Sequence, residues 1–283
     1  MRIISWNIQW GRGADGRVDV GRTIDTLRAM PEADVICLQE VAQNFPGLPD
    51  GHGEDEVALL AAAFPAHEVV FGAAVDISDG AGGRARFGNL MLSRAAVDQV
   101  FRHLLPCPPD PAQPAMQRAC VEAVVSAPWG PLRILTTHLE YYSVRQRRAQ
   151  LGALRALQEE VAEHAAGGRI DKEANPAFAA RARPVSAVVC GDFNCEPDSP
   201  EYALMAAAPS GAAAPWQDAW RVCHGARAHA PTVGLHGAEW PGRAYCCDFL
   251  WVTGDLAGRV RDVAVNATTA ASDHQPVMLE LGE

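Results

Sequence analysis

Short runs of strand-forming residues recur along the whole chain, and this recurrence constrains the fold more than any other feature of the sequence. They lie at residues 2–7, 34–38, 68–75, 87–93, 119–126, 132–138, 185–191, 247–252, 259–265 and 276–281. Helical spacing of apolar side chains occurs between only some of them, around residues 19–30 and, over several turns, 145–165. Many strands with few interposed helices favour two packed sheets with helices outside, rather than one regularly alternating parallel sheet. We therefore predict an α/β fold built on two sheets.

The segments between these runs are short loops rather than linkers. The 283 residues are long for one average domain, yet sandwiches of this size commonly fold around one extended core. We therefore expect a single domain over residues 1–283. Gly167 and Gly168 are predicted to end the long helix, and residues 169–184 then form a polar excursion. The polar side of that helix is predicted to face solvent, and it carries Arg147, Arg148, Glu159, Glu160 and Glu163.

The charge balance limits the partners that the chain could bind. Lys and Arg number 24 and Asp and Glu number 34, which gives a net charge of −10 with His neutral. A broad basic face for a polyanion is therefore not expected, and long duplex nucleic acid is an unlikely partner by this criterion. The loops 44–54 and 78–88, which we expect to border a site, contain only Arg84 and Arg86 as basic residues. A phosphorylated substrate remains compatible, because a bound metal can supply local positive charge.

The cysteines and the N-terminal sequence predict a cytoplasmic protein. The chain has eight cysteines, which form no pair of CxxC modules, and several lie inside apolar runs, where free Cys behaves as a small buried hydrophobe. Met1 leads directly into a strand-like run without an apolar signal sequence, and no run of eighteen apolar residues occurs. We expect no transmembrane segment, and the sequence gives no indication of the oligomeric state.

Polar residues stand at the ends of several predicted strands, where a side chain is held rigidly yet exposed at the sheet rim. These places are Ser5-Trp6-Asn7, Leu38-Gln39-Glu40, Thr137-His138-Leu139, Gly191-Asp192-Phe193-Asn194, Cys247-Asp248-Phe249 and Ser272-Asp273-His274. Each alone is an ordinary turn or capping sequence. Gly191 permits close backbone approach, and Asp192 and Asn194, two residues apart, can point to the same side. Asp248 begins an apolar strand and needs a partner, for which His274 is the candidate.

Together these places supply the groups that phosphoryl chemistry needs. The set is Asn7, Glu40, His138, Asp192, Asn194, Asp248, Asp273 and His274. Carboxylate and amide oxygens suit a hard cation such as Mg²⁺ or Mn²⁺. Such a cation neutralises phosphate oxygens, while carboxylate, amide and imidazole groups orient the attacking water and stabilise the transition state.

In this order, the six motifs resemble those of the endonuclease/exonuclease/phosphatase superfamily, and the stretch His138-Leu139-Glu140-Tyr141-Tyr142-Ser143 resembles its uncharacterised bacterial members. The resemblance spans nearly the whole chain. Members of this superfamily include pancreatic-type deoxyribonucleases, abasic-site endonucleases, inositol-polyphosphate phosphatases, tyrosyl-DNA phosphodiesterases and neutral sphingomyelinases. The resemblance implies the deoxyribonuclease I-like fold, a four-layer αββα sandwich of two packed mixed β-sheets with helices outside.

The resemblance also implies a role for each residue of the set. Glu40 would be the principal metal ligand, with Asn7 and Asp273 near the metal or its waters. Asp192 and Asn194 would position or activate the water and contact the phosphate. His274, oriented by Asp248, would bind the phosphate or act as general base. His138 would contact the phosphate or assist the leaving group. Arg243 lies five residues before Asp248, further than in a common pattern of the family, so its reach to the phosphate stays open.

These observations favour a Mg²⁺- or Mn²⁺-dependent phosphoesterase that acts on a small or exposed phosphodiester, with a phosphomonoester as a further option. A nuclease or DNA-repair endonuclease is the alternative within enzymes. A catalytically silent member that binds a phosphorylated ligand or a partner protein is the alternative from another class, and the complete set of site residues argues against it. We expect the identity of the substrate to depend on the loops 44–54 and 78–88 and on residues 169–184.

Overall fold

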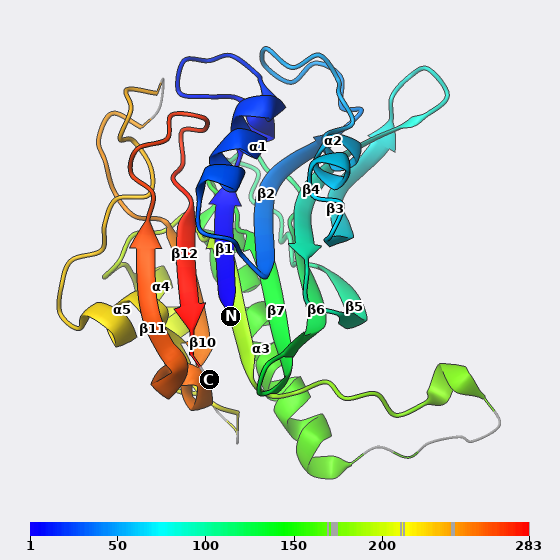
Figure 1. Ribbon diagram of the computed structural model, residues 1–283, viewed down its shortest axis with the longest axis vertical. Coiled ribbons are helices and arrows are strands. Elements are labelled where there is room, and N and C mark those ends of the chain that lie inside the picture. The colour runs from blue at the N-terminus through cyan, green and yellow to red at the C-terminus, as the bar shows by residue number, and fades with distance from the viewer. Residues whose placement is uncertain (169, 171–174, 210, 212, 239–240, 283) are drawn as a thin grey trace.

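Two six-stranded sheets form the centre of the computed structural model, which describes residues 1–168, 170, 175–209, 211, 213–238 and 241–282 (Figure 1). The first sheet has the order β11-β12-β1-β2-β4-β3 and the second the order β5-β6-β7-β8-β10-β9. Their bounds are β1 (Arg2–Asn7), β2 (Val35–Gln43), β3 (Glu68–Ser78), β4 (Arg84–Ser93), β5 (Val97–Leu104), β6 (Ala119–Ala127), β7 (Gly130–His138), β8 (Ala187–Asp192), β9 (Trp216–Asp218), β10 (Asp248–Thr253), β11 (Val260–Val265) and β12 (Val277–Leu281). Both sheets are mixed, because β1 with β2 and β7 with β8 are parallel pairs.

The helices lie outside this pair of sheets. They are α1 (Val20–Ala29), α2 (Glu56–Ala63), α3 (Val144–Gly167), α4 (Pro200–Ala206) and α5 (Ala219–His224), with short 3₁₀ helices η1 (Gln9–Gly11), η2 (Pro176–Phe178) and η3 (Gly254–Arg259). The side chain of Ser143 caps α3 by accepting from the amide of Gln146. Gly168 follows α3 with a φ of 71°, which confirms the predicted stop. Among the described residues, no helix has the length and apolar character needed to cross a membrane.

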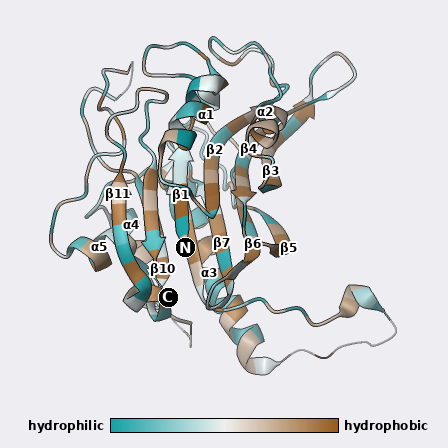
Figure 2. Ribbon diagram, in the orientation of Figure 1, coloured by the Kyte–Doolittle hydropathy of each residue, from teal (hydrophilic) through white to brown (hydrophobic). Residues whose placement is uncertain are grey.

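Three hydrophobic clusters separate four layers. Between the sheets, inward-facing side chains such as Val35, Val121 and Val188 form one cluster. A second cluster packs α3 on the outer face of the second sheet, and a third packs α1 and α2 on the outer face of the first. The strands accordingly carry most of the apolar colour in Figure 2. The arrangement confirms the predicted α/β fold, a four-layer αββα sandwich of two packed mixed β-sheets with helices outside.

The elements absent from the prediction are short or lie at an edge. β5 is an edge strand whose apolar residues, Val97, Val100, Phe101 and Leu104, are spaced as in a helix and do not alternate as in a strand. β9 has three residues and α4 and α5 have seven and six, which is too short for a periodic pattern. Every longer predicted strand is present, with bounds that differ by a few residues.

Candidate active site

The second sheet brings three of the predicted residues side by side at one rim. β7 runs parallel to β8, and their register places His138 opposite Asp192. β10 runs antiparallel to β8, and its register places Asp248 opposite Asp192 from the other side. Asp192, the last residue of β8, therefore lies between His138 and Asp248 in adjacent strands.

Gly191 allows this close packing of β7 and β8. Its φ is 140°, in the region that favours glycine. A Cβ added there would lie 1.8 Å from the carbonyl oxygen of Thr137, closer than any non-bonded pair can approach. The glycine before Asp192 is therefore a packing requirement, and it fixes the position of the carboxylate that follows.

Replacing Gly191 with alanine is expected to lower the free energy of unfolding by at least about 2 kcal/mol, because the new methyl group must displace the β7 backbone. Urea unfolding with linear extrapolation measures this change. Gly152→Ala is the matched control, since an added Cβ in this helical position meets nothing within 4 Å and should stabilise the protein slightly. Wild-type stability of the Gly191→Ala variant would contradict the packing argument.

Glu40 enters the site from a β-bulge in β2. The pairing of β2 with β4 shifts its register between Leu38 and Val41, and Glu40 has a φ of 58°. Bulges re-aim a side chain and are frequent next to active sites. The strand that we predicted to end at residue 38 thus continues through the bulge to Gln43. The carboxylate stands on a continuous strand of the first sheet rather than at a strand end.

Asn7, the last residue of β1, connects carboxylates from both sheets. Its Nδ2 donates to Oε1 of Glu40 at 3.0 Å and to Oδ2 of Asp192 at 3.1 Å. Its Oδ1 accepts from the backbone amide of Gln9 at 3.1 Å. Because Glu40 belongs to the first sheet and Asp192 to the second, the two sheet rims meet at this amide.

A chain of hydrogen bonds orients the imidazole of His274. Thr232 donates through Oγ1 to Oδ2 of Asp248 at 2.6 Å, and the same oxygen lies 2.9 Å from Nδ1 of His274. Nε2 of His274 lies 3.7 Å from Oδ2 of Asp192. Burial lowers the pKa of His274, but the charges of Asp248, Asp192 and Asp273 outweigh burial and raise this pKa well above its ordinary range. His274 is therefore a buried imidazolium held by carboxylates.

His138 lies on the other side of Asp192 and has the opposite character. Its Nε2 is 3.4 Å from Oδ2 of Asp192 and 3.0 Å from Nδ2 of Asn194. Burial, with the positive charges of Arg118 and His274, lowers the pKa of His138 well below its ordinary range. A neutral His138 can accept through Nε2 from the Asn194 amide. The site thus contains one charged and one neutral imidazole on either side of Asp192.

Asp192 and Asn194 belong to one tight turn. The backbone amide of Asn194 donates to Oδ1 of Asp192 at 2.8 Å, and Asn194 has a φ of 50°. Nδ2 of Asn194 also donates to the carbonyl oxygen of Leu139 at 2.9 Å. The turn that this sequence favours is present, and it holds both side chains against His138.

Negative charge accumulates where the two sheet rims meet. Burial and the charge of Asp273 raise the pKa of Glu40 to about 7, against the opposing effects of Asn7, His274 and Arg118. Burial likewise raises the pKa of Asp192 to about 6. Carboxylates that resist ionisation in this way would be stabilised in their charged form by a nearby cation.

These groups line a cleft of about 470 Å³. The predicted residues Glu40, His138, Asp192, Asn194, Asp273 and His274 all contribute to its surface. Asn7 and Asp248 are buried behind it and act on the lining residues through the hydrogen bonds described above. All eight predicted residues thus gather in one place.

Five further residues line this cleft that were not among the predicted site residues: Gln9, Trp10, Arg118, Tyr141 and Tyr142. Arg118 is 6% exposed, donates through Nε to Glu140 at 3.2 Å, and has a buried Nη1 without a partner among the described residues. In the sequence, one feature could have indicated that Arg118 belongs to the site: like the other site residues, it stands at the end of a predicted strand. Tyr141 and Tyr142 follow His138 closely, so the sequence did place them near the site.

The two loops expected to border the site adjoin the cleft, whereas the position expected for residues 169–184 is corrected. The carbonyl oxygen of Pro49 accepts from Nε1 of Trp10, which lines the cleft, and Phe87 and Gly88 line a small pocket together with Glu40 and His138. Arg84 and Arg86 both pair with Asp76. Residues 169 and 171–174 of the polar excursion lie outside the described residues. Its described part, 175–184, lies at the opposite end of the sheets in Figure 1, so it does not border the cleft.

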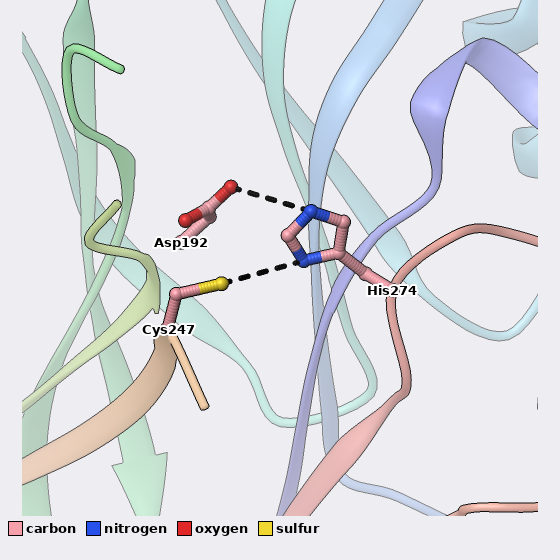
Figure 3. A group of neighbouring side chains, drawn as sticks. All are labelled: Asp192, Cys247 and His274. Atoms are coloured by element: carbon pink, nitrogen blue, oxygen red, sulfur yellow. Dashed lines mark hydrogen bonds and ion pairs between the residues drawn. The ribbon is translucent and has the colours of Figure 1, made fainter. Parts of the chain in front are cut away.

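A thiol lies beside His274 (Figure 3). Three buried side chains meet here: a carboxylate oxygen of Asp192, Sγ of Cys247 and a ring nitrogen of His274 all lie within 4.8 Å of one another. Sγ of Cys247 is 4.0 Å from Nδ1 of His274 and 3.5 Å from Oδ2 of Asp248. Burial raises the pKa of this thiol well above its ordinary range, so it stays protonated.

The residues present fit a hard divalent cation. Glu40 and Asp273 offer carboxylate oxygens in the same cleft, and the charge of Asp273 raises the pKa of Glu40. Oδ2 of Asp273 is held by Nε2 of Gln9 at 3.0 Å, which orients the carboxylate. Oxygen donors of this kind suit Mg²⁺ or Mn²⁺ better than a thiophilic ion.

A four-layer sandwich with carboxylates and imidazoles at one rim is the arrangement of a hydrolase fold. The chain belongs to the Endonuclease/Exonuclease/phosphatase family, whose model matches residues 4–274. This match confirms the family that the six motifs indicated.

Solved structures with the same fold support this assignment. An endonuclease/exonuclease/phosphatase from Beutenbergia cavernae DSM 12333 is 24% identical, with 100% of this chain and 72% of that chain covered and a TM-score of 0.71. A mannosyl-6-phosphatase from Bacteroides thetaiotaomicron VPI-5482 is 14% identical over 100% of both chains, with a TM-score of 0.66. Truncated Caenorhabditis elegans TDP2 is 18% identical, with 100% and 97% covered and a TM-score of 0.61. At these identities the likeness shows the fold. No curated protein gives a significant match.

Proposed function

We propose that the protein is a metal-dependent phosphoesterase that hydrolyses a small or exposed phosphodiester by attack of an activated water. The observation that carries this proposal is the position of Asp192. Its Oδ2 lies within 3.1 to 3.7 Å of Asn7 Nδ2, His138 Nε2 and His274 Nε2, in a cleft that also contains Glu40 and Asp273. A carboxylate so placed can accept a proton from water while the neighbouring groups bind phosphate oxygens.

Each side chain has a distinct part in this reaction. Asp192, with a pKa of about 6, is mostly ionised at neutral pH and takes the proton of the attacking water. Asn194 fixes the carboxylate and directs its amide toward the same space. The carboxylates around His274 raise its pKa, which favours binding of a phosphate oxygen by this imidazole over the alternative role of general base. His138 is neutral and contacts the phosphate or the leaving oxygen.

Glu40 and Asp273 would hold the cation, and Asn7 supports them from behind by its bond to Glu40. When bound there, the cation would neutralise negative charge on the phosphate and the leaving oxygen. Arg118 pairs through Nε with Glu140, and its guanidinium lines the same cleft with Nη1 left to bind a phosphate oxygen. The complete set of groups argues against a catalytically silent member.

A nuclease is the alternative, and the likeness to TDP2 keeps it under consideration. Against duplex DNA stands the poverty of basic residues at the site. Among the described residues that line the cleft, Arg118 is the only basic residue besides the two histidines. Arg84 and Arg86 are both paired with Asp76. Duplex binding normally depends on several Lys and Arg side chains that contact successive phosphates.

The test is a panel of substrates with Mg²⁺ or Mn²⁺, made of nitrophenyl phosphodiesters, phosphomonoesters, phospholipids, and single-stranded and duplex DNA. We expect turnover of a small ester, and weak duplex binding whose affinity changes little between two salt concentrations. Efficient nicking, with submicromolar binding that weakens steeply as salt rises, would reverse the order of the two enzyme functions. Turnover of none of these substrates would contradict both.

A further inference from the structure

A second cavity, of about 650 Å³, borders the catalytic cleft. Tyr141 and Asn194 line both spaces. Because Asn194 also contacts His138, a substrate group attached to a phosphate in the cleft would pass this asparagine and enter the second cavity. When the reacting phosphate occupies the cleft, the second cavity is therefore placed to bind the rest of the substrate.

Charged residues of this second cavity are paired with one exception. Glu201 accepts from Nε of Arg148 at 2.7 Å. Glu196 pairs with Arg243, whose guanidinium also lies over the ring of Tyr245, 4.8 Å from its centroid. Both carboxylates that line the cavity are thus neutralised by arginines. Arg147 lines the same cavity, and its positive charge is paired with no carboxylate of the described residues.

Arg147 is buried, contrary to the predicted solvent-facing side of α3. The residue is 8% exposed, and its Nη1 donates to the carbonyl oxygens of Glu140 and Tyr141 at 2.7 and 2.8 Å. Its Nε is buried without a partner, and no carboxylate of the described residues forms an ion pair with it. Burial of a guanidinium without a counter-ion is costly, and it becomes favourable when an oxyanion pairs with it.

The shape of arginine defines what would bind. Nη1 is engaged by the backbone, so the opposite edge, formed by Nε and Nη2, is the edge that pairs with two oxygens of one anion. A carboxylate and a phosphate both present such a pair of oxygens. Neither a hydroxyl nor an amide offers the same charge and geometry.

We propose that the second cavity is a subsite for a second anionic group of the substrate, a carboxylate or a phosphate, which pairs with Arg147. The inference rests on the proposed phosphoesterase function and narrows it. The substrate is a phosphoester whose alcohol carries a further oxyanion, at a distance that spans from Asn194 to Arg147. Neutral alkyl or lipid esters lack this group and bind less tightly.

The experiment compares p-nitrophenyl phosphodiesters whose second alcohol ends in a carboxylate, a phosphate or a neutral carboxamide, each with tethers of increasing length. We expect the best anionic ester to exceed its carboxamide by about 10-fold to 100-fold in kcat/KM, mainly through KM, on the scale of a charge-assisted pair. The carboxylate and phosphate arms show which oxyanion the subsite prefers. Equal kcat/KM for all three ends at every tether length overturns the inference.

Two variants assign the preference to the subsite. Arg147→Gln should reduce the ratio of anionic to neutral kcat/KM to within about twofold of unity, even if loss of its backbone bonds slows both substrates. Arg145→Gln is the matched control, because Arg145 is an exposed residue of the same helix that donates to the Pro109 carbonyl and carries the same charge. Glu196→Gln releases Arg243 and should increase the ratio severalfold. A ratio that persists in Arg147→Gln overturns the inference.

Calorimetry separates this inference from the proposed function. The phosphomonoesters of the same alcohols are titrated into the wild-type protein, the Arg147→Gln variant and the Arg145→Gln variant, with Mg²⁺ present. Tighter binding of the anionic forms, lost only in Arg147→Gln, supports the subsite even if no diester is hydrolysed, a result that would contradict the proposed function alone. Hydrolysis of anionic and neutral diesters at equal rates, with equal binding, overturns the subsite alone.

Discussion

Removal of divalent cations is expected to abolish phosphoesterase turnover, and addition of Mg²⁺ or Mn²⁺ is expected to restore it. Glu40 and Asp273 bring two carboxylates into one cleft, where burial, together with the charge of Asp273, raises the pKa of Glu40 to about 7. A divalent cation removes this repulsion and places positive charge where the phosphate oxygens must lie. Exhaustive chelation followed by metal titration measures the effect on turnover.

Binding can be measured without turnover. Saturating Mg²⁺ should raise the free energy of unfolding, by about 2.7 kcal/mol at a concentration 100 times the dissociation constant. Glu40→Gln should remove most of this increase, while Glu68→Gln, a change of the same type at an exposed position of β3, should leave it intact. Full turnover after exhaustive chelation would contradict the metal-dependent mechanism.

Asp192→Asn and His274→Ala should each lower kcat by at least roughly 100-fold, a scale typical for the loss of a catalytic base or of a transition-state contact. Asparagine keeps the shape of Asp192 but cannot accept the proton of the water. Removal of the His274 side chain withdraws an imidazole that lies 3.7 Å from Asp192 and leaves Asp248 with Thr232 but without its imidazole partner. Steady-state kinetics on the best substrate of the panel give the values.

The stability of Asp192→Asn distinguishes a catalytic role from a structural one. Burial raises the pKa of Asp192 to about 6, which means that its charged form is disfavoured in the folded protein at neutral pH. A neutral asparagine should therefore leave the melting temperature unchanged or raise it while activity falls. Asp198→Asn, at an exposed carboxylate that pairs with Arg221 on the surface, is the control for the substitution itself. Near-wild-type kcat in either active-site variant would remove that residue from the mechanism.

The site could be predicted from the sequence because its residues follow strands. Asp192 ends a buried strand and Asp248 begins one, so their types and positions were visible, and the sheet register brought them together. The pairing of Asp248 with His274 was also inferred correctly, since a buried carboxylate at a strand start requires a partner. The fold followed from the same strands, because two sheets with few helices leave few ways to bury them.

Other features depend on tertiary contacts that local sequence does not contain. The bulge at Glu40 requires the β2–β4 pairing, in which the two strands lie about 50 residues apart in the chain. Arg147 seemed to belong to a solvated helix face, because helical periodicity cannot show that the backbone of Glu140 and Tyr141 lies over that position. The apolar residues of edge strand β5 do not alternate, so its sequence lacks the period that makes a strand recognisable.

The position of β12 in the first sheet has a consequence for folding kinetics. β12 pairs with β1 and with β11, and the amino group of Met1 donates to the carbonyl oxygen of Leu281, 280 residues away in sequence. During synthesis, β1 must remain without this neighbour until almost the whole described chain has left the ribosome. Contacts of such high sequence separation slow folding, because loop-closure entropy is lost before they form. Asp273 and His274 lie a few residues before β12, so the candidate active site is completed only after this late strand docks.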